Sequence, residues 1–132
     1  MPGEVDAQTT VRRLIEAFGA ADIDGMRPLL AADLRAYVTN AEGGADAVVG
    51  ADEYLARVEA MDLPSAEFRI ELTQLVEPTP GQVLAMVEIN ATRGERRLHN
   101  HAAHLLSIVD GVVAEWWMVE ALPAESDAFW SR

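Results

Sequence analysis

Two predicted strands and the turn between them fill residues 96–121, which read RRLHNHAAHLLSIVDGVVAEWWMVEA. Asp110-Gly111 is the strongest hairpin signal in the chain, because both residue types tolerate the positive φ angles of a tight turn. Apolar and aromatic residues on both sides of this turn predict strands over residues 96–109 and 112–121. We therefore expect a sheet built around this hairpin.

The residues before this hairpin continue the same pattern. Phe68, Ile70 and Leu72 alternate with charged residues, which predicts a half-buried antiparallel strand that begins near residue 66. Two prolines and a glycine in residues 77–82 predict a turn, and a second strand follows over residues 83–92. The second half of the chain is therefore expected to be an antiparallel sheet.

The first half of the chain has helical spacing instead. Four apolar residues share one helical face and predict an amphipathic helix over residues 5–21; they are Val11, Leu14, Ile15 and Phe18. Asp24 is the expected N-cap of a short second helix that contains Pro28. A further helix is predicted from four residues on one face and ends before Pro64; they are Tyr54, Leu55, Val58 and Met61.

The remaining segments are assigned by their composition. Residues 34–39 are predicted to form a short strand, and residues 40–50, with three glycines, a mobile loop. Residues 122–132 are treated as a tail that includes Phe129-Trp130. The helices therefore precede the long strands, and the fold class is predicted to be α+β in one domain, residues 1–132.

The turn positions predict which side chains share a face of the sheet. A two-residue turn at Asp110-Gly111 pairs Val109 with Val112, Leu106 with Glu115 and His104 with Trp117. Treating Arg93-Gly94 in the same way pairs Ile89 with Leu98. The mostly apolar face is assigned to the interior: Val83, Ala85, Val87, Ile89, Leu98, Asn100, Ala102, His104, Leu106, Ile108, Val113, Glu115, Trp117 and Val119. A β-bulge would exchange the faces beyond it.

The expected interior face holds a few polar groups among apolar ones, as small-molecule pockets do. His104 and Glu115 become diagonal neighbours, so the carboxylate can orient the imidazole as a general base. The alternative is a core histidine that bonds Glu115 only to satisfy both buried groups. Tyr37 can donate a hydrogen bond into the same pocket or be an ordinary half-buried strand residue.

The opposite, mixed face is suited to a subunit interface and includes Met86, Trp116 and Met118. His99 and His101 lie on it, two residues apart, and Glu88 or Glu120 could add a carboxylate ligand for a metal. His104 falls on the other face, so the three histidines do not converge. We therefore expect no metal site, and an interface or surface role for His99 and His101.

Composition excludes several classes of partner. The 132 residues carry 10 basic and 22 acidic side chains, a formal net charge of -12, which opposes binding to nucleic acids or anionic membranes. The chain has no cysteine, so disulfides and thiolate sites are excluded. No signal peptide pattern and no apolar run of ~18 residues is present, and we expect a cytoplasmic protein.

Several of these segments resemble the nuclear transport factor two-like superfamily, specifically its SnoaL-like branch. They are His101-Ala102-Ala103-His104, the Asp110-Gly111 hairpin with Glu115 and Trp117, and the closing Asp127-Ala128-Phe129-Trp130. The resemblance implies a curved antiparallel sheet wrapped around three N-terminal helices, with an apolar cavity and dimerisation through the sheet. Its members include ketosteroid isomerases, polyketide cyclases, dehydratases, epoxide hydrolases and proteins without demonstrated activity.

The expected function is therefore acid-base catalysis without a cofactor, by isomerisation or cyclisation of a small apolar carbonyl metabolite. His104 would carry the proton and Glu115 would orient it. Asn100 and Tyr37 would hold the carbonyl, and Trp117 would form a wall of the pocket. The cyclase pattern implies a carboxylate near the end of the last strand, supplied by Glu120 or Glu115. The alternative is a non-catalytic module for ligand binding or dimerisation.

Overall fold

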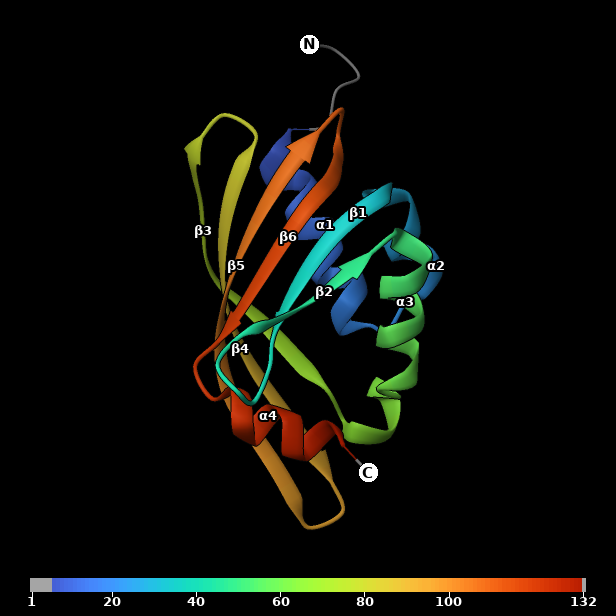
Figure 1. The fold of residues 1–132 in the computed structure, drawn as a ribbon, viewed down its shortest axis with the longest axis vertical. Coiled ribbons are helices and arrows are strands. Elements are labelled where there is room, and N and C mark those ends of the chain that lie inside the picture. The colour runs from blue at the N-terminus through green and yellow to red at the C-terminus, as the bar shows by residue number, and fades with distance from the viewer. Residues whose placement is uncertain (1–5, 132) are drawn as a thin grey trace.

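A computed structural model describes residues 6–131. Its helices are α1 (Ala7–Gly19), α2 (Ile23–Met26), α3 (Ala51–Ala60) and α4 (Pro123–Trp130) (Figure 1). Its strands are β1 (Leu30–Thr39), β2 (Ala45–Val49), β3 (Arg69–Thr79), β4 (Gln82–Arg93), β5 (Arg96–Val109) and β6 (Val112–Glu120). Short 3₁₀ turns occupy Arg27–Leu29 and Leu63–Ala66. The predicted α+β class is confirmed.

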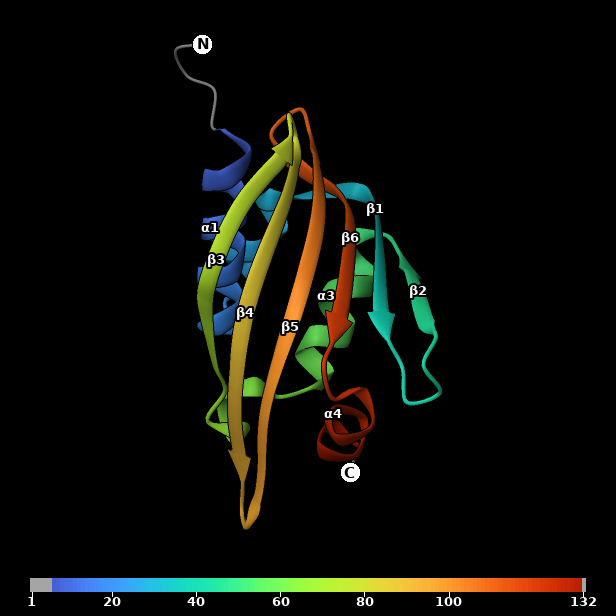
Figure 2. The ribbon, with the colours of Figure 1, turned by 90° about the vertical axis from the view of Figure 1, so that its left-hand side faces the viewer.

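The strands form one curved sheet in the order β2-β1-β6-β5-β4-β3. Figure 2 shows the long strands β3, β4 and β5, with α1 and α3 on one face of the sheet and α4 near one end. Neighbouring strands are antiparallel except β1 and β6, which run parallel. These two strands lie far apart in the sequence, so no hairpin fixes their relative direction. The prediction of an antiparallel sheet is therefore wrong for the pair β1 and β6.

Helix α1 packs its predicted apolar stripe onto the sheet. Val11, Leu14, Ile15 and Phe18 are all buried in the main core. Asp6 caps the helix, because its Oδ1 accepts a hydrogen bond of 2.8 Å from the Thr9 amide. Within residues 6–131, no helix combines the length and apolar character needed to cross a membrane.

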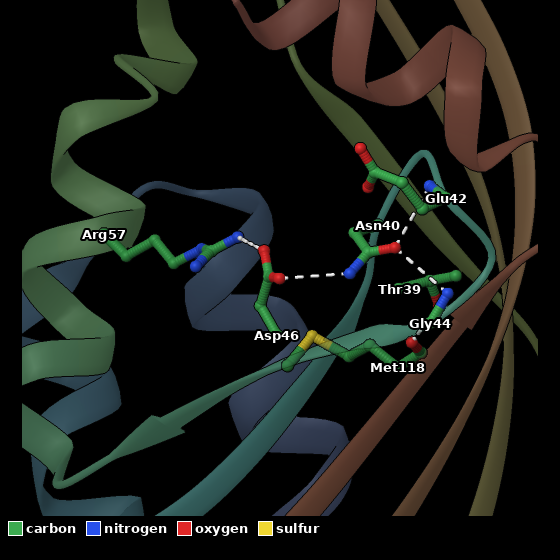
Figure 3. A network of polar contacts seen from close by, with 7 residues as sticks. All are labelled: Thr39, Asn40, Glu42, Gly44, Asp46, Arg57 and Met118. Atoms are coloured by element: carbon green, nitrogen blue, oxygen red, sulfur yellow. Dashed lines mark hydrogen bonds and ion pairs between the residues drawn. The ribbon is translucent and has the colours of Figure 1, made fainter.

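The structure corrects two predictions in the first half of the chain, and in both places a side chain bonds to nearby backbone amides. Asp22, not Asp24, is the N-cap of α2, since its Oδ1 accepts from the Gly25 amide at 2.9 Å. Residues 40–50 contain strand β2, not only a loop. Asn40 Oδ1 accepts from the amides of Glu42 and Gly44 and closes the turn that returns β2 against β1 (Figure 3).

The expected tail forms helix α4. Pro123 occupies its first turn, where a proline's missing amide proton is tolerated. Phe129 packs with Ala66, Ala91 and Leu98 in a second, smaller core. This packing supplies the stability that an eight-residue helix lacks alone, and it holds α4 over the end of the sheet.

The β4–β5 hairpin keeps the predicted faces although its turn differs. Arg93 pairs with Arg96, so the turn is Gly94-Glu95 and Ile89 pairs with Asn100, not with Leu98. The partners therefore shift by two residues. Because side chains alternate with a period of two, an even shift leaves every side chain on its predicted face.

The β5–β6 hairpin contains a bulge that exchanges the faces. Val109 pairs with Val112 as predicted, but Ser107 pairs with Glu115, so Ala114 is an extra residue in β6. Beyond it Leu106 pairs with Trp116. The predicted pairs Leu106–Glu115 and His104–Trp117 are therefore wrong. Trp116 and Met118 are buried in the core, whereas Trp117 and Val119 are exposed.

Candidate functional site

A cavity of about 80 Å³ lies on the inner face of the sheet, against α3 and α4. Its walls are mostly apolar, with side chains such as Phe18, Val38, Phe68, Ile70, Met118 and Trp130. Six side chains with polar groups also line it: Tyr54, Arg57, Asn100, His104, Glu120 and Ser126. A few polar groups that converge in an apolar cavity are typical of a small-molecule site.

His104 lies on β5 and is buried. Its Nδ1 accepts a hydrogen bond of 3.1 Å from Trp116 Nε1. Because an indole nitrogen only donates, this contact fixes the ring proton on Nε2. Burial lowers the pKa of His104 from 6.5 to about 4, so the ring is neutral near pH 7. His104 therefore contributes a neutral N–H donor.

Asn100 lies four residues before His104 on the same strand and is fully buried. Its Oδ1 accepts hydrogen bonds from the amides of His101 at 2.9 Å and Leu122 at 3.0 Å. Its Nδ2 is buried and has no hydrogen-bond partner among residues 6–131. A buried donor without an acceptor costs about 1–3 kcal/mol, which an acceptor in the cavity would recover.

Glu120 closes strand β6 at the cavity and is half-buried. Burial raises the pKa of its carboxyl group, and the nearby charge of Asp127 raises it further. Ser126 Oγ donates to Glu120 Oε1 at 3.0 Å, which partly offsets the rise. A carboxylate with a raised pKa is a stronger base than an exposed one.

Helix α3 contributes two further groups. The hydroxyl of Tyr54 donates to Met118 Sδ at 3.7 Å, and burial raises the pKa of the phenol, so it stays protonated. Arg57 lies one turn later on the helix. Its guanidinium pairs with Asp46 Oδ2 at 3.3 Å, and Asp46 also accepts from Asn40, as Figure 3 shows. This network ties the β1–β2 turn to the helix that lines the cavity.

The structure brings together three of the six predicted site residues: Asn100, His104 and Glu120. Glu115 does not reach His104, because the extra residue Ala114 turns it to the outer face of the sheet. Its Oε1 accepts from Trp117 Nε1 at 2.9 Å. The predicted His104–Glu115 pair is therefore wrong.

Tyr37 and Trp117 are also placed outside the cavity. Their rings stack with centroids 3.9 Å apart and an interplanar angle of 16°. Tyr37 pairs with Trp117 across the parallel β1–β6 contact, so both lie on the outer face. The neighbours of Tyr37 in β1, Ala36 and Val38, belong to or pack against the core instead.

Four residues that bear on the cavity's chemistry were not predicted as site residues. Tyr54 was assigned to a buried helix face, and Arg57 follows at a spacing of three that places both on one side of α3. Ser126 lies in the segment that the sequence predicts to be a tail and that forms α4. Pro123 is the residue there that could have indicated the start of a helix. Trp116 was assigned to the wrong face, and the bulge that moves it has no clear signal in the local sequence.

Comparison with known proteins identifies relatives that share this fold. Protein Rv0034 of Mycobacterium tuberculosis, which is uncharacterized, is 25% identical over 122 residues, 92% of this chain and 93% of the relative. The structure of Bal32a, from a soil-derived mobile gene cassette, superposes with a TM-score of 0.83 at 20% identity, covering 95% and 96% of the two chains.

A second solved structure, a proposed SnoaL-like polyketide cyclase of Jannaschia sp. CCS1, has a TM-score of 0.78 at 16% identity. The alignment covers 100% of this chain and 96% of that one. At these identities the likeness concerns the fold. Residues 11–116 match the family described as SnoaL-like domain, which is most of the sequence. The chain therefore belongs to the SnoaL-like domain family.

Proposed function

We propose that this protein catalyses proton transfer on a small carbonyl compound bound in the cavity. The observation that carries the proposal is the buried Nδ2 of Asn100, which has no hydrogen-bond partner among the described residues and lines an apolar cavity together with the neutral His104. Two neutral donors suit a carbonyl oxygen. They suit even better the oxyanion that forms when a neighbouring carbon loses a proton.

Glu120 is the proposed base. In its ionised form it would take a proton from the carbon next to the carbonyl, and the electron pair would move onto the carbonyl oxygen. The raised pKa increases its strength as a base. If the substrate has a β,γ double bond, the enolate is conjugated, and return of the proton from Glu120 to the γ carbon gives an isomerisation. Attack of the enolate carbon on a second carbonyl gives an alkoxide, which takes the proton back from Glu120 and completes an aldol-type cyclisation.

His104 has a different role in this proposal from the one expected from the sequence. Its Nδ1 accepts from Trp116, so Nε2 carries the proton and cannot accept another. The pKa of about 4 also opposes protonation of the ring near neutral pH. His104 would therefore act as a hydrogen-bond donor to the substrate oxygen, while Glu120 moves the proton.

The size of the cavity restricts the substrate. A volume of about 80 Å³ holds about two or three water molecules at roughly 30 Å³ each. Sites for drug-sized ligands are larger, about 300–1,000 Å³. The proposed substrate is therefore a compact ketone or aldehyde, or a larger one that displaces Trp130 and α4 at the cavity wall.

The small volume also favours a second candidate function, a non-catalytic module whose cavity holds a compact ligand. In that case Asn100 and His104 would bind an acceptor on the ligand, and Glu120 would transfer no proton. The two functions differ in one observable property, the exchange of protons on the bound carbonyl compound.

Exchange of α-protons for deuterium in cyclopentanone, followed by ¹H NMR in D₂O, tests the proposal. The native protein should accelerate exchange, and Glu120→Gln should slow it by about 10²–10⁴-fold. Glu115→Gln is the matched control, since Glu115 lies on the outer face of the same strand. Equal rates in both variants, or no acceleration by the native protein, would favour the non-catalytic module.

A further inference from the structure

Three side chains on the outer face of the sheet converge away from the cavity: Glu88 on β4, and His99 and His101 on β5. The two histidines are separated by one residue, so the strand directs both imidazoles to the same side. Glu88 pairs directly with His101 across the β4–β5 ladder. Asn100, between the histidines, faces the cavity instead.

The ligand atoms of the three side chains lie near the spacing that a shared ion requires. Glu88 Oε2 lies 2.5 Å from His99 Nε2 and 3.8 Å from His101 Nε2. One ligand atom from each residue lies within 4.8 Å of the others. Tetrahedral zinc, with bonds of about 2.0–2.2 Å, holds neighbouring ligand atoms about 3.4 Å apart. The side chains of His99 and His101 are 59% and 62% exposed, so small rotations can close the difference.

Although the sequence alone predicts no metal site, we propose that Glu88, His99 and His101 bind a divalent transition-metal ion such as Zn²⁺. Two imidazoles and one carboxylate favour zinc, cobalt or nickel over magnesium and calcium, which prefer oxygen ligands. Three protein ligands leave a coordination position open to water or to another molecule. The site lies on the opposite face from His104, which takes no part in it.

The neighbouring strand supplies a second argument for a cation. Glu71 on β3 is exposed and pairs directly with Glu88. Two carboxylates directly opposite each other in a sheet repel, and a bound cation beside them offsets that repulsion. The formal net charge of -12 also raises the local concentration of cations around the chain.

Calorimetric titration of the tag-free protein with ZnCl₂ tests the site. We expect one zinc ion per chain and no heat of binding with MgCl₂ under the same conditions. Zinc binding should weaken by more than about 100-fold in each of three variants: His99→Gln, His101→Gln and Glu88→Gln. That loss exceeds the effect of about 10–100-fold that is typical of replacing a residue that only hydrogen-bonds a metal ligand. Glu115→Gln, an outer-face carboxylate outside the cluster, is the control and should leave the affinity unchanged.

NMR of the three histidines identifies the ligands independently. Zinc should shift the ring signals of His99 and His101 and leave those of the buried His104 unchanged, which also reports that the fold is intact. The proposal is overturned if no zinc binds, if either histidine variant binds as tightly as the native protein, or if His104 responds instead.

Discussion

Trp116 Nε1 donates a hydrogen bond of 3.1 Å to His104 Nδ1 inside the sheet, and both side chains are buried. The bond depends on the extra residue Ala114, which brings Trp116 to the inner face of β6. It satisfies the indole, fixes the imidazole tautomer and leaves Nε2–H as the ring's remaining donor. One backbone irregularity therefore determines the chemistry that His104 can perform.

Replacing Trp116 should remove both the packing and the tautomer control. Trp116→Phe should lower the free energy of unfolding by about 2–4 kcal/mol, through lost volume and an unsatisfied Nδ1. Urea unfolding measures this loss, and ¹⁵N NMR of His104 should report a mixture of tautomers. Trp117→Phe is the control, because Trp117 is 39% exposed and should lose about 1 kcal/mol or less. Equal losses in the two variants would contradict the assigned faces.

The buried His104 should make stability depend on pH. Its pKa is lowered from 6.5 to about 4, so the unfolded chain binds more protons between these values and stability falls as pH decreases. Between about pH 7 and about pH 5, the native protein should lose about 2 kcal/mol more than His104→Gln. Urea unfolding at both pH values measures the difference. His99, His101 and the carboxylates are common to both proteins, so a difference near zero would contradict a buried, neutral His104.

The pH profile of deuterium exchange should follow Glu120. Because burial raises its carboxyl pKa, the rate should fall on acidification at a higher pH than an ordinary glutamate would give. Ser126→Ala removes a hydrogen bond that lowers this pKa, so the acidic limb should move further upward. Rates measured over a pH series test both statements. A limb that does not respond to Ser126→Ala would argue against Glu120 as the base.

Asn100 should have two separable roles. Its Oδ1 accepts from the Leu122 amide just before α4, and its Nδ2 faces no partner among the described residues. Asn100→Asp keeps the acceptor and should slow exchange of cyclopentanone protons by about 10²–10³-fold, as for loss of an oxyanion donor. Asn100→Ala should also expose the Leu122 amide to hydrogen exchange. Protection of that amide in Asn100→Ala would contradict the capping role.

The sequence predicted the elements better than the register. The alternation of Phe68, Ile70 and Leu72, and the length of β5, follow from the burial of one sheet face, which acts on every residue of a strand. The predicted inner positions of Asn100 and His104 are correct although the predicted Arg93-Gly94 turn is not. The strand pairing differs from the prediction by two residues, and an even shift keeps each side chain on the same face.

The rest of the site could not be predicted, because it depends on contacts distant in sequence. The Ala114 bulge moved Glu115 and Trp117 outward, and its residue type gives no signal of a bulge. Helix α4 depends on Phe129 packing against Leu98, which a local pattern does not reveal. The family resemblance predicts Glu120 as a pocket carboxylate, whereas the predicted register places it on the outer face.

Deletion of Ala114 tests this reading of the bulge. Removing the residue shifts the rest of β6 by one and directs Glu115 toward the core. Burial of an unpaired carboxylate and loss of the Trp116 contact should cost more than about 4 kcal/mol, a large part of the roughly 5–15 kcal/mol that stabilises a typical domain. Circular dichroism and urea unfolding measure the effect. A deletion variant as stable as the native protein would contradict the role assigned to Ala114.

The central claim is that Asn100 and His104 donate to one acceptor in the cavity, and NMR of the ¹⁵N-labelled protein titrated with cyclopentanone tests it most directly. The account predicts saturable downfield shifts of the Asn100 Nδ2 protons and the His104 Nε2 proton, with the exposed His99 and His101 unaffected. Shifts confined to surface residues, or unchanged Asn100 and His104 signals at saturating ketone, would contradict it.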